Sequence, residues 1–238
     1  MSVTKPERSL PAHLKGPSAW LCIPLAGALL LTSAPSLSAD IISQMTPQGR
    51  QVVLQRDAIV VKQDSSSIVY KHFDLKERRV VKVVLQESSL PYDVSRSAPD
   101  GRKQIVELWK RFGFAATVTD SAGKTTRIYD AFIDFYPPGG SGSLLESVPA
   151  RTDFPIALTS GGSDLFDFAD VTRVELQGDE LRVTLANGQA KEGRFLMPTS
   201  KPAEARLLGI TEHYDPSSGD VFDFSLPLAR IKQIDFEH

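Results

Sequence analysis

The stretch that decides the fold is "LFDFADVTRVEL", Leu165–Leu176, because the chain returns to the same phrase in "VFDFSLPLARIKQIDF", Val221–Phe236. Each copy carries Phe-Asp-Phe, then a short corner, then a strand in which apolar and polar residues alternate. Alternation along a strand sends successive side chains to opposite faces. It predicts that Phe166 and Phe168 point into a core and that Asp167 faces solvent.

The second copy predicts the same arrangement, with Phe222 and Phe224 inside and Asp223 outside. We therefore expect Phe168 and Phe224 to occupy equivalent buried positions. The last strand of each copy supplies the other inward residues, which are Val171, Val174 and Leu176 in the first and Ile231, Ile234 and Phe236 in the second, with Leu228 at the corner.

The repeat extends upstream of this phrase. "ATVTDSAGKTTRIYDAFIDFYP" has the layout of "LRVTLANGQAKEGRFLMPTSKP", with Val118 and Gly123 in the places that Val183 and Gly188 take 65 residues later. Each copy predicts a hairpin, a third strand, a turn and the closing phrase. Five short strands in about 60 residues are typical of a small β-barrel, whose closure removes exposed sheet edges. We expect two tandem β-barrel-like repeats, 114–178 and 179–238.

Only "QGDE", Gln177–Glu180, separates the last strand of the first repeat from the first strand of the second. A turn this short predicts a hairpin that pairs Val174 with Val183 or their neighbours. The two repeats would then share a sheet or lie rigidly side by side. A groove built by both of them is the expected partner site.

The second repeat resembles the SH3-type and Sm-like family of small barrels. The resemblance rests on "VTLANGQAKEGRF" followed by "GDVFDFSLPLARIKQIDF", in which Gly188 and Gly193 stand five residues apart. The first repeat has Gly123, but Ile128 stands where a second glycine is expected. A helix before the first repeat also resembles the one that precedes the barrel in Sm-like proteins. RNA binding does not follow, because shared fold is no evidence of shared function.

Residues 40–113 are expected to form a separate N-terminal region. "RDAIVVKQDSSSIVYKHFDL" and "ERRVVKVVLQ" have a period of two and predict an antiparallel meander, and "LPYDVSRSAPDG" predicts a loop. The period then changes to that of an amphipathic helix over 102–112. Its apolar stripe is expected to contain Ile105, Leu108, Trp109 and Phe112.

Asp100 or Ser97 is expected to cap this helix, and Gly113 to end it. Arg102, Lys103, Lys110 and Arg111 are expected on its solvated faces; a docking patch for an acidic partner is the alternative. The fold class is thus mainly β, with an N-terminal meander, one amphipathic helix and two small barrel-like repeats.

Residues 1–39 follow the three-part pattern of a signal peptide. Lys5, Arg8 and Lys15 form its basic region, an apolar stretch runs from Ala19 to Leu31, and small residues precede a cut after Ala39. A signal anchor or a buried helix is the alternative, but the apolar stretch falls short of the about 20 residues that span a bilayer. We expect a periplasmic or secreted protein without a membrane span after cleavage.

The sole cysteine, Cys22, lies in this leader, so the mature chain has no thiol chemistry and no disulfide. From Asp40 onward there are 24 Lys/Arg and 28 Asp/Glu, a net charge of −4. Residues 40–111 carry net +4 and residues 112–238 carry net −8. The acidic C-terminal half disfavours nucleic acid as a partner, because phosphate binding relies on clustered Lys and Arg.

Motifs for catalysis are missing from the sequence. His72 and His213 stand alone in apparent strands, without the His-x-x-x-His spacing of a zinc protease. "GSGSLL", with Ser141 and Ser143, lacks the Gly-x-Ser-x-Gly pattern of a nucleophile elbow. "SAGKTT" lacks the upstream glycine of a phosphate-binding loop.

Two acidic sets remain, Asp215–Asp220 and the group Asp164, Asp167 and Asp170. Plain turns and solvated strand-edge carboxylates are the favoured interpretation, with calcium binding as the alternative. The sequence therefore nominates no catalytic, cofactor-binding or metal-ligating residue, and no cofactor.

We expect an exported, non-catalytic binding or assembly module of the bacterial cell envelope, with a protein partner there and with no particular oligomeric state indicated. Two alternatives stay open. One is a carboxylate-dependent hydrolase of envelope glycans, which needs only two well-placed acidic residues. The other is a sensor of calcium or a small ligand.

Overall fold

The computed structural model describes residues 39–54, 58–63, 67–74, 79–86, 92–139, 148, 150–218 and 220–238. Strands dominate this part of the chain, which holds a single α-helix, α1 (Pro99–Phe112), so the expected mainly β class is confirmed. Outside the described residues lie the predicted leader up to residue 38, with Cys22, and also Ser141 and Ser143. Within the described ranges, no helix has the length and apolar character needed to cross a bilayer.

Two three-stranded antiparallel sheets come from the N-terminal region. The expected meander is confirmed as β3 (Ile59–Gln63), β4 (Ser67–Asp74) and β5 (Arg79–Gln86). The other sheet has the order β2-β1-β6 and consists of β1 (Ile41–Thr46), β2 (Gly49–Leu54) and β6 (Tyr92–Ser95).

The sequence did not predict this second sheet, and it assigned β6 to a loop. Ile42 of β1 lies opposite Val94 of β6, and both pack against Val60 and Tyr70 of the meander. The strand forms because β1 supplies backbone partners and the meander supplies an apolar surface. Short strands depend on such tertiary partners more than on their own propensity.

Helix α1 buries a different stripe from the expected one. Leu108 is half-buried and Phe112 is 39% exposed, whereas Val106 and Arg102 are buried. The buried side is Gly101, Arg102, Ile105, Val106 and Trp109. The helix begins earlier than predicted, with Pro99 in its first turn, where the missing N–H costs nothing.

Neither Asp100 nor Ser97 caps the start of the helix. The N-cap is Ala98, which makes no side-chain hydrogen bond. The Ser97 hydroxyl donates instead to Asp40. The prediction that Arg102 faces solvent is wrong. Its guanidinium lies 3.7 Å from the buried Asp40 carboxylate and donates to the Val60 carbonyl at 3.1 Å. A buried arginine of this kind needs partners from distant segments, which helical periodicity does not show.

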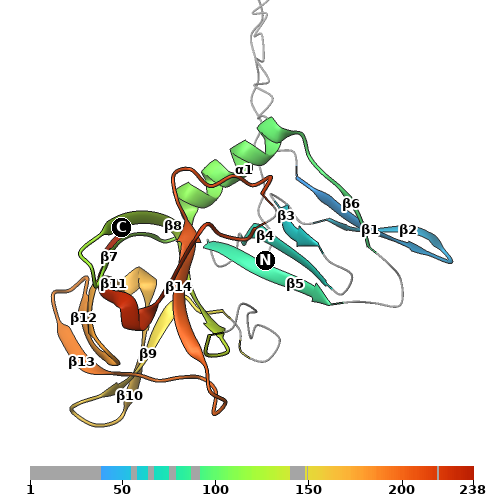
Figure 1. Cartoon of the computed structure of the whole chain (residues 1–238). Coiled ribbons are helices and arrows are strands. Elements are labelled where there is room, and N and C mark those ends of the chain that lie inside the picture. Colours follow the sequence, from blue (N-terminus) through green and yellow to red (C-terminus); the bar gives the residue numbers. More distant parts are fainter. Residues whose placement is uncertain are drawn as a thin grey trace, which may run out of the picture. The chain divides into compact units, whose positions relative to one another are not determined.

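The remaining strands form one curled antiparallel sheet of ten strands, ordered β10-β9-β13-β12-β11-β16-β7-β8-β14-β15 (Figure 1). The strands of the first repeat are β7 (Ala115–Asp120), β8 (Thr125–Tyr136), β9 (Asp153–Leu158), β10 (Ser163–Asp167) and β11 (Val171–Gln177). Those of the second are β12 (Glu180–Leu185), β13 (Ala190–Phe195), β14 (Glu204–Ile210), β15 (Phe224–Pro227) and β16 (Ile231–Glu237). A 3-10 turn precedes each last strand, η1 (Phe168–Asp170) before β11 and η2 (Leu228–Arg230) before β16.

The strands of the two repeats share this sheet and do not separate into two barrels. One half of the sheet, which we call the inserted half, is the continuous stretch β9–β13. The other, the flanking half, joins β7 and β8 from before it with β14, β15 and β16 from after it. The predicted boundary between residues 178 and 179 falls in the turn of the β11–β12 hairpin.

The short turn explains this arrangement. Gly178 has a φ of 68°, and the two-residue turn pairs Gln177 with Glu180 and Val174 with Val183, as the sequence predicted. β12 must therefore lie beside β11, and β13 follows it into the same half. The first hairpin of the first repeat, β7–β8, is left to pair with β16 and β14.

An approximate two-fold relation links the halves. Val174 of β11 lies opposite Ile234 of β16, its own counterpart 60 residues later, and Val183 and Val118 flank this pair on either side. The two 3-10 turns are also 60 residues apart in the sequence, so Phe168, the first residue of η1, corresponds to Leu228, the first residue of η2. The expected equivalence of Phe168 and Phe224 is wrong. Phe168 is the first residue of its 3-10 turn, whereas Phe224 lies four residues before the start of the second 3-10 turn.

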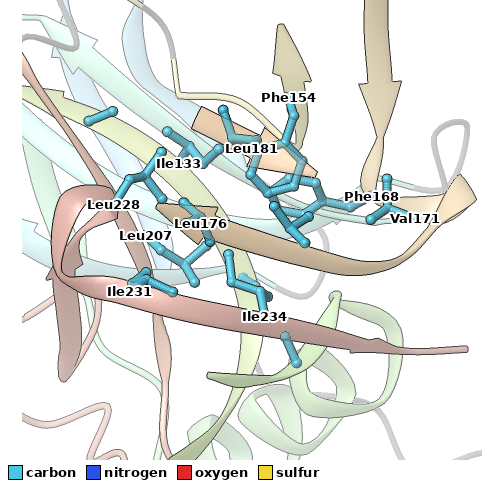
Figure 2. Packing of buried hydrophobic residues seen from close by; sticks show 14 of the residues in the cluster. Ile133, Phe154, Phe168, Val171, Leu176, Leu181, Leu207, Leu228, Ile231 and Ile234 are labelled. Atoms are coloured by element: carbon cyan, nitrogen blue, oxygen red, sulfur yellow. The ribbon is translucent and has the colours of Figure 1, made fainter. Parts of the chain in front are cut away.

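The core of the ten-stranded sheet takes apolar residues from both repeats. Phe168 is fully buried, with its ring centroid 4.9 Å from that of Phe154 and 4.6 Å from that of Phe236. Figure 2 shows this cluster, with Val171 and Ile234 among its labelled members. Asp167 is exposed, so the predicted alternation holds in the first copy.

Candidate binding site

A groove of about 380 Å³ lies where the two repeats meet. Its lining comes from the turn after β9, the end of β11, the start of β12, the middle of β13 and the start of β16. The residues are Thr159, Glu175, Leu176, Gln177, Glu180, Leu181, Arg182, Glu192, Gly193, Arg194, Lys232 and Gln233. The composite groove that the short linker predicted is therefore present, and the β11–β12 hairpin lies along it.

Charged residues of both signs alternate across the strands at this groove. Register places Glu175, Arg182 and Glu192 side by side on β11, β12 and β13. The Arg182 guanidinium lies 4.0 Å from Glu175 and 3.8 Å from Glu192. These ion pairs are largely exposed, and such pairs contribute about 0–1 kcal/mol each. They present a patterned polar surface without holding the fold together.

Lys232 adds a further positive charge to the groove from the start of β16. The charged lining then has three acidic and three basic side chains, Glu175, Glu180, Glu192, Arg182, Arg194 and Lys232. A surface of this kind complements a ligand that also carries both signs, such as an extended polypeptide. It lacks the single strong charge that would select a polyanion.

Gly193 has a steric reason to be glycine. It lies on β13 opposite Leu158 of β9, and a Cβ at this position would overlap the Ala157 carbonyl oxygen and the Ile156 side chain. The second glycine of the barrel-like pattern thus lets two strands of the inserted half approach closely. Ile128 takes the corresponding place in the flanking half.

Four charged side chains are buried elsewhere, under the N-terminal meander. Lys71 of β4 forms an ion pair with Asp130, and Lys82 of β5 lies 3.2 Å from Asp134. Both aspartates belong to β8, and Asp130 has a φ of 52°, a strained value for a residue other than glycine. The basic N-terminal region and the acidic half are therefore joined by complementary charges.

Burial shifts the pKa of two residues of this cluster. Desolvation raises the pKa of Asp130, and the neighbouring Lys71 opposes the rise. Desolvation also lowers the pKa of Lys82, while Asp134 opposes the change. The Lys71 and Lys82 ammonium groups lie 5.7 and 4.7 Å from the centre of the Phe132 ring. Each charge thus faces a protein partner, an arrangement that fastens segments together.

A third buried carboxylate belongs to Asp40, the residue expected to begin the mature chain. It accepts hydrogen bonds from the backbone N–H groups of Val60 and Ser97, at 2.9 and 2.7 Å. Arg96 and Arg102 lie 3.5 and 3.7 Å away. Asp40 therefore ties the start of the described chain to the meander and to α1.

The residues weighed as sites in the sequence do not come together. His72 lies half-buried in β4, and His213 is exposed after β14. The described residues contain no cluster of three His, Cys, Asp or Glu side chains able to hold a metal ion. Asp215 accepts from the Ser217 hydroxyl and N–H, a local turn bond that lowers its pKa.

The other acidic set and the Gly-Lys-Thr sequence also form local structure. Asp167 accepts from the Ala169 N–H at the start of η1. Asp120 accepts from the N–H groups of Ala122 and Lys124 and so organises the "SAGKTT" turn. These aspartates act as turn residues, since short side chains readily bond to the backbone two residues on.

Comparison with protein-family models, curated proteins and solved structures finds no match for this chain. The likeness to SH3-type and Sm-like barrels stays a prediction.

Sequence reasoning missed the buried ion pairs. A signal was present: Asp130 and Asp134 interrupt the otherwise apolar run of β8, "IYDAFIDFY". Charges on the inner stretch of a long strand indicate partners of opposite sign. The sequence alone does not indicate that Lys71 and Lys82 are those partners.

Proposed function

We propose that this chain is an exported, non-catalytic binding or assembly module of the bacterial cell envelope, and that the composite groove is its binding site. The observation that carries the proposal is that both repeats line the groove. Strands of both repeats pair directly beside one another in one sheet, and this backbone pairing holds the groove in shape.

Other features support the proposal. The N-terminal residues have the pattern of a cleaved leader. The buried charges are paired with one another, so they serve to join segments of the chain. The charged residues of the groove have both signs, which suits the mixed surface of another polypeptide.

Export is tested by fractionating cells that make the protein and sequencing its N-terminus. We expect a chain that begins at Asp40 in the periplasm or the medium. An intact Met1 on cytoplasmic protein would contradict the proposal.

Binding is tested by capture from solubilised envelope fractions with the wild-type chain and with an Arg182→Glu/Lys232→Glu double variant. We expect capture of a discrete protein, reduced at least 10-fold by the variant, because charge reversal places acidic groups against acidic groups. Lys124→Glu/Lys201→Glu is the matched control, since both lysines are exposed, lie outside the groove and give the same change in net charge. Equal capture by both double variants, or release of sugars from purified envelope glycan, would overturn the proposal.

A further inference from the structure

Three apolar residues lie side by side in a row on the inserted half: Leu165 of β10 and Leu196, directly after β13, are exposed, and Pro155 of β9 between them is half-buried. Leu165 of β10 lies opposite Pro155 of β9, and the Leu196 N–H donates to the Pro155 carbonyl at 2.8 Å. Their neighbours Phe154, Ile156 and Phe166 belong to the core, so alternation places the row on the outer face of the sheet. Leu165 is 54% exposed and Leu196 is 39% exposed.

The corresponding row of the flanking half is covered. By the two-fold relation its members are Ser225, Leu208 and Phe132, which register places opposite one another on β15, β14 and β8. Leu208 is fully buried and Phe132 is 7% exposed. Phe132 and Leu208 pack with Tyr136, Ala150 and Phe222, and Lys71 and Lys82 of the N-terminal meander lie over the Phe132 ring.

The two rows thus differ in burial, because other described parts of the chain pack on one row and not on the other. Equivalent strands present apolar residues outward in both halves, and in one half this chain supplies the cover. Exposed Leu165, Leu196 and the adjacent Met197, itself 37% exposed, have no cover among the described residues. Exposed apolar side chains gathered on one face of a sheet are typical of an interaction site.

Charge at the end of the row indicates the chemistry of the missing cover. Asp153 and Asp167 lie directly opposite each other on β9 and β10, next to Pro155 and Leu165. Like charges in this position repel. Arg151 lies 2.6 Å from Asp153 and balances one of them, so a basic group on a partner would relieve the other.

At the edge strand β10, part of the backbone is already hydrogen-bonded within this chain. The Leu165 N–H is bonded to the Asp164 carboxylate at 2.9 Å, so β10 does not offer this donor to an added strand. The outer face, with its side chains, is therefore the surface on offer.

We propose that the outer face of β9, β10 and β13 docks a second protein, which lays apolar side chains over Pro155, Leu165 and Leu196 and sets a lysine or arginine against Asp153 and Asp167. This proposal rests on the proposed binding function and names the chemistry of the partner. It assigns the partner to the end of the sheet next to the groove, whose lining includes Glu192 and Arg194 of β13 but not Pro155, Leu165 or Leu196. The partner covers the inserted half as other parts of this chain cover the flanking half.

The experiment uses the full chain with a photo-reactive phenylalanine derivative at position 165, in the cells that naturally make the protein. Position 45 is the matched control, because Met45 is also an exposed apolar strand residue, at 58%, and lies on β1. We expect irradiation to give one discrete protein cross-link from position 165 and none from position 45. No cross-link, a link to lipid, or a link between two copies of this chain would overturn the proposal.

The cross-linked protein is then purified and titrated against variants by calorimetry. We expect Leu165→Asp and Asp167→Lys each to weaken binding at least 10-fold, while Met45→Asp changes it less than 2-fold. The effect of Asp167→Lys should shrink at 1 M salt, where charges are screened. Unchanged binding by Leu165→Asp, at an unchanged melting temperature, would overturn the proposal.

A third photo-reactive position, Gln177 in the groove, separates this proposal from the proposed function. Cross-links from 177 alone would leave the groove as the binding site and refute docking on the outer face. A cytoplasmic protein linked at 165 would support the docking face and contradict the envelope location.

Discussion

The two halves of the ten-stranded sheet share a strand order but differ on their outer faces. In the flanking half, Phe132 of β8 and Leu208 of β14 are buried on the outer face, where Asp134 of β8 pairs with Lys82 of the meander. In the inserted half, the outer face of β13 is exposed and that of β9 is half-buried. The same architecture can therefore serve as an internal interface in one place and as an open surface in the other, according to what the chain lays upon it.

The largest expected effect concerns the ion pair that fastens the covered face. Lys71→Met leaves the Asp130 carboxylate buried without its cation, and breaking a buried pair costs about 3–5 kcal/mol. Arg151→Met, which breaks the partly exposed pair of the open half, should cost about 0–1 kcal/mol. Denaturant unfolding at pH 7 measures both.

The Lys71→Met loss should also depend on pH. Desolvation raises the pKa of Asp130, and removing the opposing lysine raises it further. A protonated Asp130 is neutral, so the difference from the wild type should shrink as the pH falls. A difference that grows on acidification would contradict this account.

Core truncation gives the next largest effect and compares the faces directly. Leu208→Ala should cost about 2–5 kcal/mol, because it leaves a cavity beside Phe132 and Tyr136. Leu196→Ala, on the open face, should change stability by about 0.5 kcal/mol or less, as exposed substitutions do. Similar losses for the two variants would mean that the open face is covered in solution, for example in an oligomer.

The smallest effect is expected in alkali. Burial, with Asp134 nearby, raises the pKa of Tyr136 to about 12, against about 10 in an unfolded chain. The stability that this tyrosine contributes is complete below pH 10 and is lost as the pH rises toward 12, since only the unfolded chain ionises readily. Tyr136→Phe should therefore lose less stability than the wild type between pH 9 and 11.5, by about 1 kcal/mol after allowance for partial solvation. Equal losses would show that Tyr136 is solvated.

The alternation of apolar residues predicted much of the fold. It placed Phe168, Val171 and Val174 in the core, and the spacing of Val174 and Val183 around Gly178 predicted their pairing. These features are local, since a strand's two faces and a two-residue turn are set by neighbouring residues. The groove followed from the same turn, although its charge pattern required the register of four strands.

The similar sequences of the two copies gave wrong predictions at positions where tertiary packing determines the structure. Phe224 repeats the sequence context of Phe168, yet Leu228 fills the equivalent place, because the 3-10 turn sets the register of the last strand. Arg102 has the helical position of a solvated residue, yet it is buried beside Asp40. Strand propensity does not predict β1 and β6, because these strands form by pairing with each other and packing against the meander.

By itself, the sequence determined the strand-rich class, the repeated unit, the inward faces of its last strands and the hairpin that joins the repeats, because these depend on periodicity and on turn residues close in the chain. Tertiary structure alone decided that β7 and β8 join β14, that Lys71 and Lys82 meet Asp130 and Asp134, and that one outer face stays open. Those outcomes depend on which distant surfaces meet and exclude water, and residues that are far apart in the chain carry no local signal of their meeting.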